Sequence, residues 1–154
     1  MQKAFRKGPM GSLVDEYEKA LLELKGVLGN IEDKDFLKTC NPDKTTKLHT
    51  IKDICNHVIA AGYIYSNNIR RTFQEIEMKP EFAFQSASDT VHHLDLMFAH
   101  TLVTVKDKYI LTDDQLNQIR VKTSWEDYSL EGILEHAITH ILRHRRQVEI
   151  FLSQ

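Results

Sequence analysis

Apolar residues recur every three or four positions in four long segments of this chain, and this spacing limits its fold more than any other feature. The chain of 154 residues has only three prolines and six glycines, so few positions interrupt a helix. The spacing predicts helices over about residues 12–31, 50–78, 89–107 and 129–152. No segment alternates apolar and polar residues as a half-buried strand would. We therefore expect an all-α fold, in which the four helices bury their apolar faces together as a four-helix bundle.

Residues suited to helix ends support these boundaries. Ser12, Thr50 and Ser129 each stand just before an apolar stripe, where a side-chain oxygen can cap a helix. Pro80 should end the second helix, because the residue before a proline disfavours helix. We expect an irregular segment over 109–128 that includes one short capped turn.

Composition and charge exclude several classes of protein. The length fits one domain over residues 1–154. The net charge of -2 argues against a nucleic-acid binder, which usually carries a basic excess. The sequence has neither a transmembrane stretch nor an apolar secretory signal. Two cysteines, Cys40 and Cys55, fit a reducing compartment, and Cys55 lies on an apolar helix face. We expect a cytoplasmic protein with no nucleic-acid or membrane partner.

Three histidines stand four residues apart in the last helix: His136, His140 and His144. On a helical wheel His140 and His144 turn toward the apolar stripe, and His136 borders it. The charged residues, Arg143 and Arg146 among them, take the opposite side. Imidazoles one turn apart can bind one transition metal. The alternative is a pair of core histidines satisfied by hydrogen bonds, and the spacing alone leaves both interpretations open.

A third ligand must come from another helix, and His57 is the candidate. It lies seven residues after the Thr50 cap, between the apolar stripe and the charged side of its helix. The wheel permits a ligand there without requiring one. His93 and His100 share the polar side of the third helix, and we expect them at the surface, with a subunit contact as the alternative.

Two segments carry a resemblance to a known family. Thr50-Ile-Lys-Asp-Ile-Cys-Asn-His57 and His136-Ala-Ile-Thr-His140-Ile-Leu-Arg-His144-Arg-Arg-Gln147 resemble motifs of the DinB-like superfamily of four-helix-bundle metalloenzymes. The resemblance implies an up-down-down-up bundle, often a homodimer. It also implies His57, His140 and His144 as metal ligands, with His136 as an accessory residue of the pocket or one that supports a ligand.

The implied chemistry is that of an open metal site. Three neutral imidazoles leave a position free on a divalent ion, as in catalytic zinc centres. Zinc is the first choice by availability, and nickel and iron stay open. The resemblance implies a hydrolase or an enzyme that transfers a thiol to an electrophile, acting on a small-molecule substrate. The rival hypothesis is a non-catalytic binding or interaction module.

Asp53 is the carboxylate nearest to His57 along the sequence. It lies one turn before His57, so it could orient that imidazole or accept a proton. The alternative is a solvated carboxylate that the dipole favours at the start of a helix.

Overall fold

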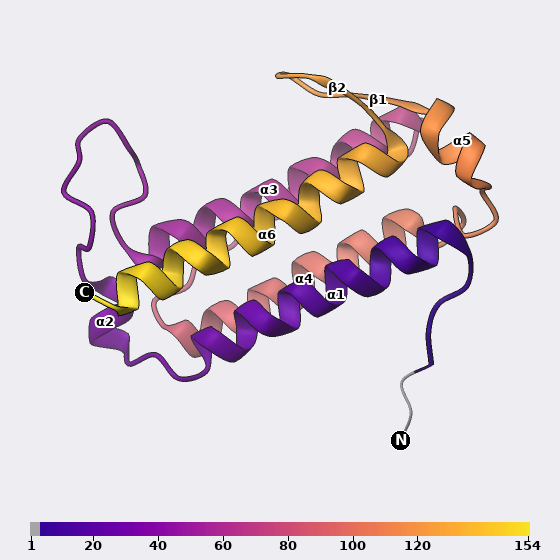
Figure 1. Cartoon of the computed structure of the whole chain (residues 1–154). Helices are drawn as coiled ribbons and strands as arrows, with labels where there is room; N and C mark the ends of the chain where they lie inside the picture. The colour runs from indigo at the N-terminus through magenta and orange to yellow at the C-terminus, as the bar shows by residue number, and fades with distance from the viewer. Residues whose placement is uncertain (1–3) are drawn as a thin grey trace.

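The four amphipathic segments form four long helices, which confirms the all-α prediction. The computed structural model describes residues 4–154 (Figure 1). The long helices are α1 (Gly8–Leu28), α3 (Ile51–Thr72), α4 (Ala87–Val105) and α6 (Leu130–Leu152). The short elements are α2 (Asp33–Leu37), α5 (Asp113–Gln118), β1 (Arg120–Lys122) and β2 (Asp127–Ser129). Within residues 4–154, none of the helices combines the length and the apolar character that a membrane span needs.

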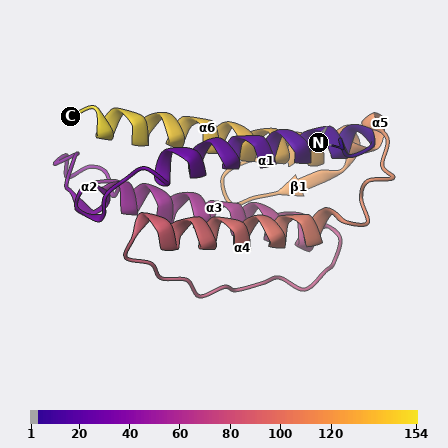
Figure 2. The same ribbon diagram turned by 90° about the horizontal axis from the view of Figure 1, so that it is seen from below.

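The helices run in the order up, down, down, up. α1 and α6 point in one direction, and α3 and α4 point in the other (Figures 1 and 2). Each of α1 and α3 packs against both α4 and α6. Because α3 and α4 are parallel, the connection between them must return along the whole bundle. Residues 73–86 make this return, and Figure 2 shows them crossing one side of the bundle below α4.

The predicted caps of α3 and α6 are present. Thr50 Oγ1 accepts a hydrogen bond from the Asp53 backbone N–H at 3.0 Å, and Asp53 Oδ2 accepts one from the Thr50 N–H at 2.9 Å. This reciprocal pair is a capping box. Ser129 Oγ accepts from the Gly132 N–H at 2.9 Å. Both helices that carry the candidate ligands therefore begin where the sequence predicts.

The first helix begins and ends earlier than predicted. α1 starts at Gly8, with Pro9 in its first turn, where a missing N–H costs nothing. Ser12 lies inside the helix, and its hydroxyl donates to the Gly8 carbonyl. The prediction of a Ser12 cap was therefore wrong. The helix ends at Leu28 rather than at residue 31.

The boundaries facing the 73–86 connection also differ from the prediction. α3 ends at Thr72, well before Pro80. The Asn67 side chain bonds to the connection that follows α3. It donates to the Met78 carbonyl at 2.6 Å and accepts from the Met78 N–H at 2.9 Å. At the other end Ser86 caps α4, which starts at Ala87. The start of α4 thus follows a local cap, whereas the bonds between Asn67 and Met78 join residues eleven positions apart.

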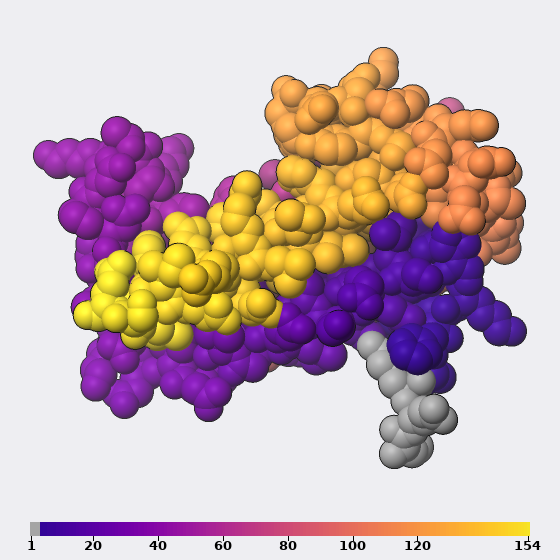
Figure 3. All heavy atoms as spheres, in the orientation of Figure 1, coloured from indigo at the N-terminus to yellow at the C-terminus, as the bar shows by residue number. Residues whose placement is uncertain are grey.

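A β-hairpin occupies part of the segment that we expected to be irregular. β1 and β2 are antiparallel, with Val121 opposite Tyr128. Val121 is fully buried, and the hairpin packs on α3 and α6. In the space-filling view the hairpin residues (orange) stand above the first turns of α6 (Figure 3). The prediction missed the hairpin because its strands have only three residues each.

Candidate metal centre and pocket

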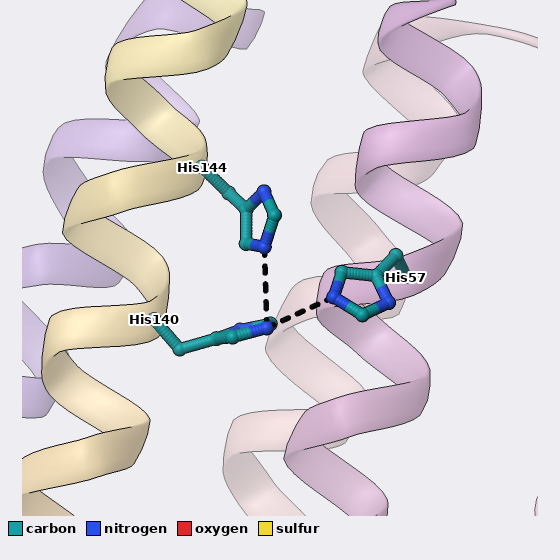
Figure 4. Close-up of side chains that lie close together, drawn as sticks. All are labelled: His57, His140 and His144. Atoms are coloured by element: carbon teal, nitrogen blue, oxygen red, sulfur yellow. Dashed lines mark hydrogen bonds between the residues drawn. The ribbon is translucent and has the colours of Figure 1, made fainter. Parts of the chain in front are cut away.

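Three histidine side chains from two helices point toward one another between α3 and α6 (Figure 4). The Nε2 atom of His140 lies 3.0 Å from Nε2 of His57 and 3.2 Å from Nε2 of His144. One ring nitrogen from each residue falls in a set whose members all lie within 4.8 Å of one another. His140 and His144 are each only 5% exposed, whereas His57 is exposed. The structure thus brings together the three residues that the sequence singled out.

The spacing of these nitrogens fits a shared ion. Zinc binds imidazole nitrogen at about 2.0–2.1 Å, so two ligands of a tetrahedral ion lie about 3.3 Å apart. The two Nε2–Nε2 distances of 3.0 and 3.2 Å are close to that separation. His140 Nε2 can carry at most one proton, so it can donate to only one of its two neighbours. A cation would satisfy the lone pairs that hydrogen bonding cannot.

The polar partner of His144 fixes which of its nitrogens faces the cluster. His144 Nδ1 lies 3.0 Å from Gln147 Oε1. An amide oxygen only accepts, so Nδ1 carries the proton and Nε2 presents a lone pair. Such a bond on the far side of a ligand imidazole is usual in metal sites. Gln147 lies three residues after His144 on the same helix, a spacing that could have identified it from the sequence.

The surroundings of the three imidazoles favour their neutral forms. Burial and the neighbouring His144 and His57 rings lower the pKa of His140 to about 3. Burial outweighs the bond from Gln147 and lowers the pKa of His144 to about 4. Burial and the nearby Arg143 guanidinium also lower the pKa of His57. All three are therefore in the neutral form that a metal requires.

A pocket of about 340 Å³ opens beside the cluster. Its walls include the following residues: His57, Tyr65, Trp125, His136, His140 and Arg143. The sequence analysis placed Arg143 on the side of α6 opposite the apolar stripe; the residue is exposed there and also lines the pocket, which the sequence did not indicate. The sequence analysis also did not identify Tyr65 or Trp125 as site residues. Trp125 lies between β1 and β2, so it reaches the pocket only because the hairpin forms.

His136 lies in this pocket, one turn from His140. The two rings stack with centroids 6.2 Å apart. His136 Nδ1 lies 3.4 Å from the Tyr128 hydroxyl, which accepts a hydrogen bond from Trp125 Nε1 at 3.1 Å. These contacts connect the hairpin to α6 and place His136 as a pocket residue.

Asp53 serves the start of α3. Its Oδ2 accepts hydrogen bonds from the backbone N–H groups of His49 at 3.1 Å and Thr50 at 2.9 Å. The carboxylate is thus directed to the backbone at the start of α3. No hydrogen bond or ion pair within residues 4–154 joins Asp53 to His57.

A second, larger pocket contains none of the three histidines. It has a volume of about 420 Å³ and lies between α4 and the 73–86 connection. His100 lines it and is only 7% exposed, so the prediction of a surface position for His100 was wrong. Its ring lies 5.3 Å from that of Tyr63, beneath the connection that returns over α4. Size alone does not make this pocket the candidate site.

Comparisons with known proteins agree with this architecture. The sequence pattern of the DinB family matches residues 11–154, which is nearly the whole chain. A crystal structure of a DinB-like protein from Bacillus subtilis, at 2.30 Å resolution, has a similar fold with a TM-score of 0.63. That likeness covers 92% of this chain and 90% of the other at 14% sequence identity, so it concerns the fold alone. None of the curated proteins matches this chain. The extent of the family match leads to one conclusion: this chain belongs to the DinB family.

Proposed function

We propose that His57, His140 and His144 bind one divalent metal ion, zinc in the first place, and that the protein is a metal-dependent enzyme acting on a small molecule. One observation carries the proposal. Three neutral imidazole nitrogens converge within 4.8 Å, beside a pocket wide enough for a small ligand. Nickel and iron are the alternative ions, because imidazole suits them as well.

The number of ligands supports a catalytic rather than a structural ion. Structural zinc normally has four protein ligands, whereas catalytic zinc has three and an open position. His136 is the nearest further histidine, but its ring stacks beside His140 with its Nδ1 near the Tyr128 hydroxyl. Three successive turns of one straight helix cannot all reach one ion. This argument favours an enzyme over a non-catalytic interaction module.

Thiol transfer is the reaction that the pocket supports best. A bound zinc ion would act as a Lewis acid that lowers the pKa of a neighbouring thiol or water. Among the residues that the structure describes, no aspartate or glutamate lines the pocket to activate water. A thiol, with an ordinary pKa near 8.5, needs less help from a base than water does.

We assign the proton transfer to His136. In this scheme His136 accepts the proton of the thiol, and the sulfur forms a bond to an electrophilic carbon of the second substrate. The leaving group departs from that carbon with its electron pair. Hydrolysis is the second candidate, since His136 is the pocket group that could take a proton from water.

Metal content tests the site directly. Plasma mass spectrometry would be run on untagged protein after incubation with zinc and dialysis. We expect about one equivalent in the wild type and in His92→Ala, an exposed histidine on α4. His57→Ala, His140→Ala and His144→Ala should each lose it. Folded wild type without metal would contradict the proposal.

Activity tests the chemistry separately. Small thiols would be screened against a bimane electrophile that fluoresces once a C–S bond forms. We expect turnover in zinc-loaded wild type and a rate about 10²-fold lower in His136→Gln, with metal content unchanged. Turnover of esters or amides in place of thiol transfer would favour the hydrolase.

A further inference from the structure

The pocket beside the three histidines holds an arginine that has no partner among residues 4–154. Arg143 lines the pocket, and within residues 4–154 no hydrogen bond or ion pair engages its guanidinium. Other arginines of the bundle are paired: Arg71 binds Glu77, and Arg145 on α6 binds Glu23. Because no carboxylate of the described residues lines the pocket, none of them neutralises Arg143 there.

The charge of Arg143 reaches the candidate site. Its guanidinium contributes to the lowered pKa values of His57, His140 and His144. It also opposes the effect of burial on Tyr65, whose pKa is still raised to about 12. The geometric observation is that Arg143 lines the same pocket as His57 and His140, so its guanidinium is within reach of a ligand bound there. Its preferred ligands are planar anions such as carboxylates.

The remaining wall of the pocket is aromatic and apolar. The rings of Tyr65 and Trp125 meet edge to face with centroids 6.1 Å apart. The bond from Trp125 Nε1 to the Tyr128 hydroxyl orients the indole. Ala61 and the half-exposed Ile64 complete this side. A volume of about 340 Å³ lies near the lower end of the range for small-molecule sites.

We propose that this pocket binds a small organic anion, whose charged group bonds to Arg143 and whose apolar body packs against Tyr65 and Trp125. The inference deepens the proposed function and rests on it, because the anion would be a substrate of the same site. Its preference for negative charge, however, depends on Arg143 and can be measured without metal.

Trp125 provides the measurement, since it is the one tryptophan among the 154 residues. Its emission would be followed in metal-free protein while cyclohexanecarboxylate or cyclohexanecarboxamide is added at constant ionic strength. The two probes share a shape and differ in charge, and neither absorbs near the excitation wavelength. Equilibrium dialysis would give the same Kd values independently of fluorescence.

We expect the carboxylate to bind about tenfold tighter than the carboxamide. Arg143→Gln should abolish this preference, and Arg143→Lys should keep part of it. Arg146→Gln is the matched control, because Arg146 is exposed on the same helix and does not line the pocket. Equal affinity for the two probes in wild type, absence of saturable carboxylate binding, or an unchanged preference in Arg143→Gln would each overturn the inference.

Zinc binding by the same variants, measured on separate zinc-incubated samples, separates this inference from the proposed function. If zinc does not bind, the metalloenzyme proposal fails. A carboxylate preference that disappears in Arg143→Gln would still establish the anion site. If zinc binds and the charge preference is absent, the metal centre stands and the anion site falls.

Discussion

His144 and Gln147 form a hydrogen bond in which imidazole Nδ1 lies 3.0 Å from amide Oε1, on the side of the ring away from the cluster. This bond holds the ring so that Nε2 faces His140, 3.2 Å away. Gln147 therefore takes part in the proposed centre without being one of its ligands.

Replacing Gln147 should weaken metal binding while leaving the fold intact. Gln147→Leu removes the acceptor for Nδ1–H, so the ring loses both its orientation and part of its basicity. We expect zinc affinity, measured by competition with a chromogenic chelator, to fall about 10- to 100-fold. Gln147→Glu keeps an acceptor and should retain most of the affinity. Wild-type affinity in Gln147→Leu would show that the bond does not matter for the site.

Metal removal should lower the thermal stability of the wild type. A ligand at about 100 times its Kd adds about 2.7 kcal/mol to the free energy of unfolding. When a chelator removes the metal, this stabilisation is lost, and for a chain of this size Tm should fall by about 5–10 °C. His57→Ala should show no such shift, because it cannot retain the ion.

The same variants distinguish a ligand role from a structural one. His57 is exposed, so His57→Ala should unfold within about 0.5 kcal/mol of metal-free wild type. His144 is 5% exposed and bonded to Gln147, so His144→Ala should cost about 1–3 kcal/mol even without metal. A large loss in metal-free His57→Ala would mean that this residue supports the fold.

Asp53 should matter for stability and not for metal. Asp53→Ala removes the acceptor for two backbone N–H groups at the start of α3. We expect the free energy of unfolding in urea to fall by about 1 kcal/mol, as for other lost caps. Zinc content should stay at the wild-type level. Loss of zinc from folded Asp53→Ala would restore Asp53 as a partner of His57.

The two cysteines should differ in reactivity across the alkaline range. Burial raises the pKa of the Cys55 thiol to about 12. A raised pKa means less thiolate at a given pH. At pH 9 Cys55 is therefore a thiolate in only about one molecule in a thousand. Iodoacetamide should therefore modify half-buried Cys40 and spare Cys55 in native protein, as peptide mass spectrometry would show. Both should react in guanidinium. Rapid native labelling of Cys55 would indicate that α3 opens locally.

Local sequence signals predicted the helices that carry the candidate ligands. Thr50 and Ser129 mark the starts of α3 and α6 because a cap depends only on residues within one turn. The inward direction of His140 and His144 follows from helical periodicity and the neighbouring apolar stripe. The family resemblance selected His57, which the wheel alone only permitted.

Features that depend on distant contacts were predicted less well. α3 ends early, at Thr72, and Asn67 then bonds to Met78, a contact that no local signal marks. His100 is buried because the 73–86 connection covers one side of α4. Arg143 was assigned to the outer side of its helix, although the neighbouring α3 and the hairpin complete a pocket around it.

The sequence by itself determined the helical bundle and the residues of the candidate metal centre. Helix periodicity and caps are short-range properties, and the histidine spacing fixes which side chains share a face. Only the tertiary structure decided the size, charge and walls of the pocket. The packing of α3 on α6 brings His57 to His140, and the hairpin adds Trp125. A pocket is formed by surfaces from several elements, and their relative placement depends on packing across the whole chain.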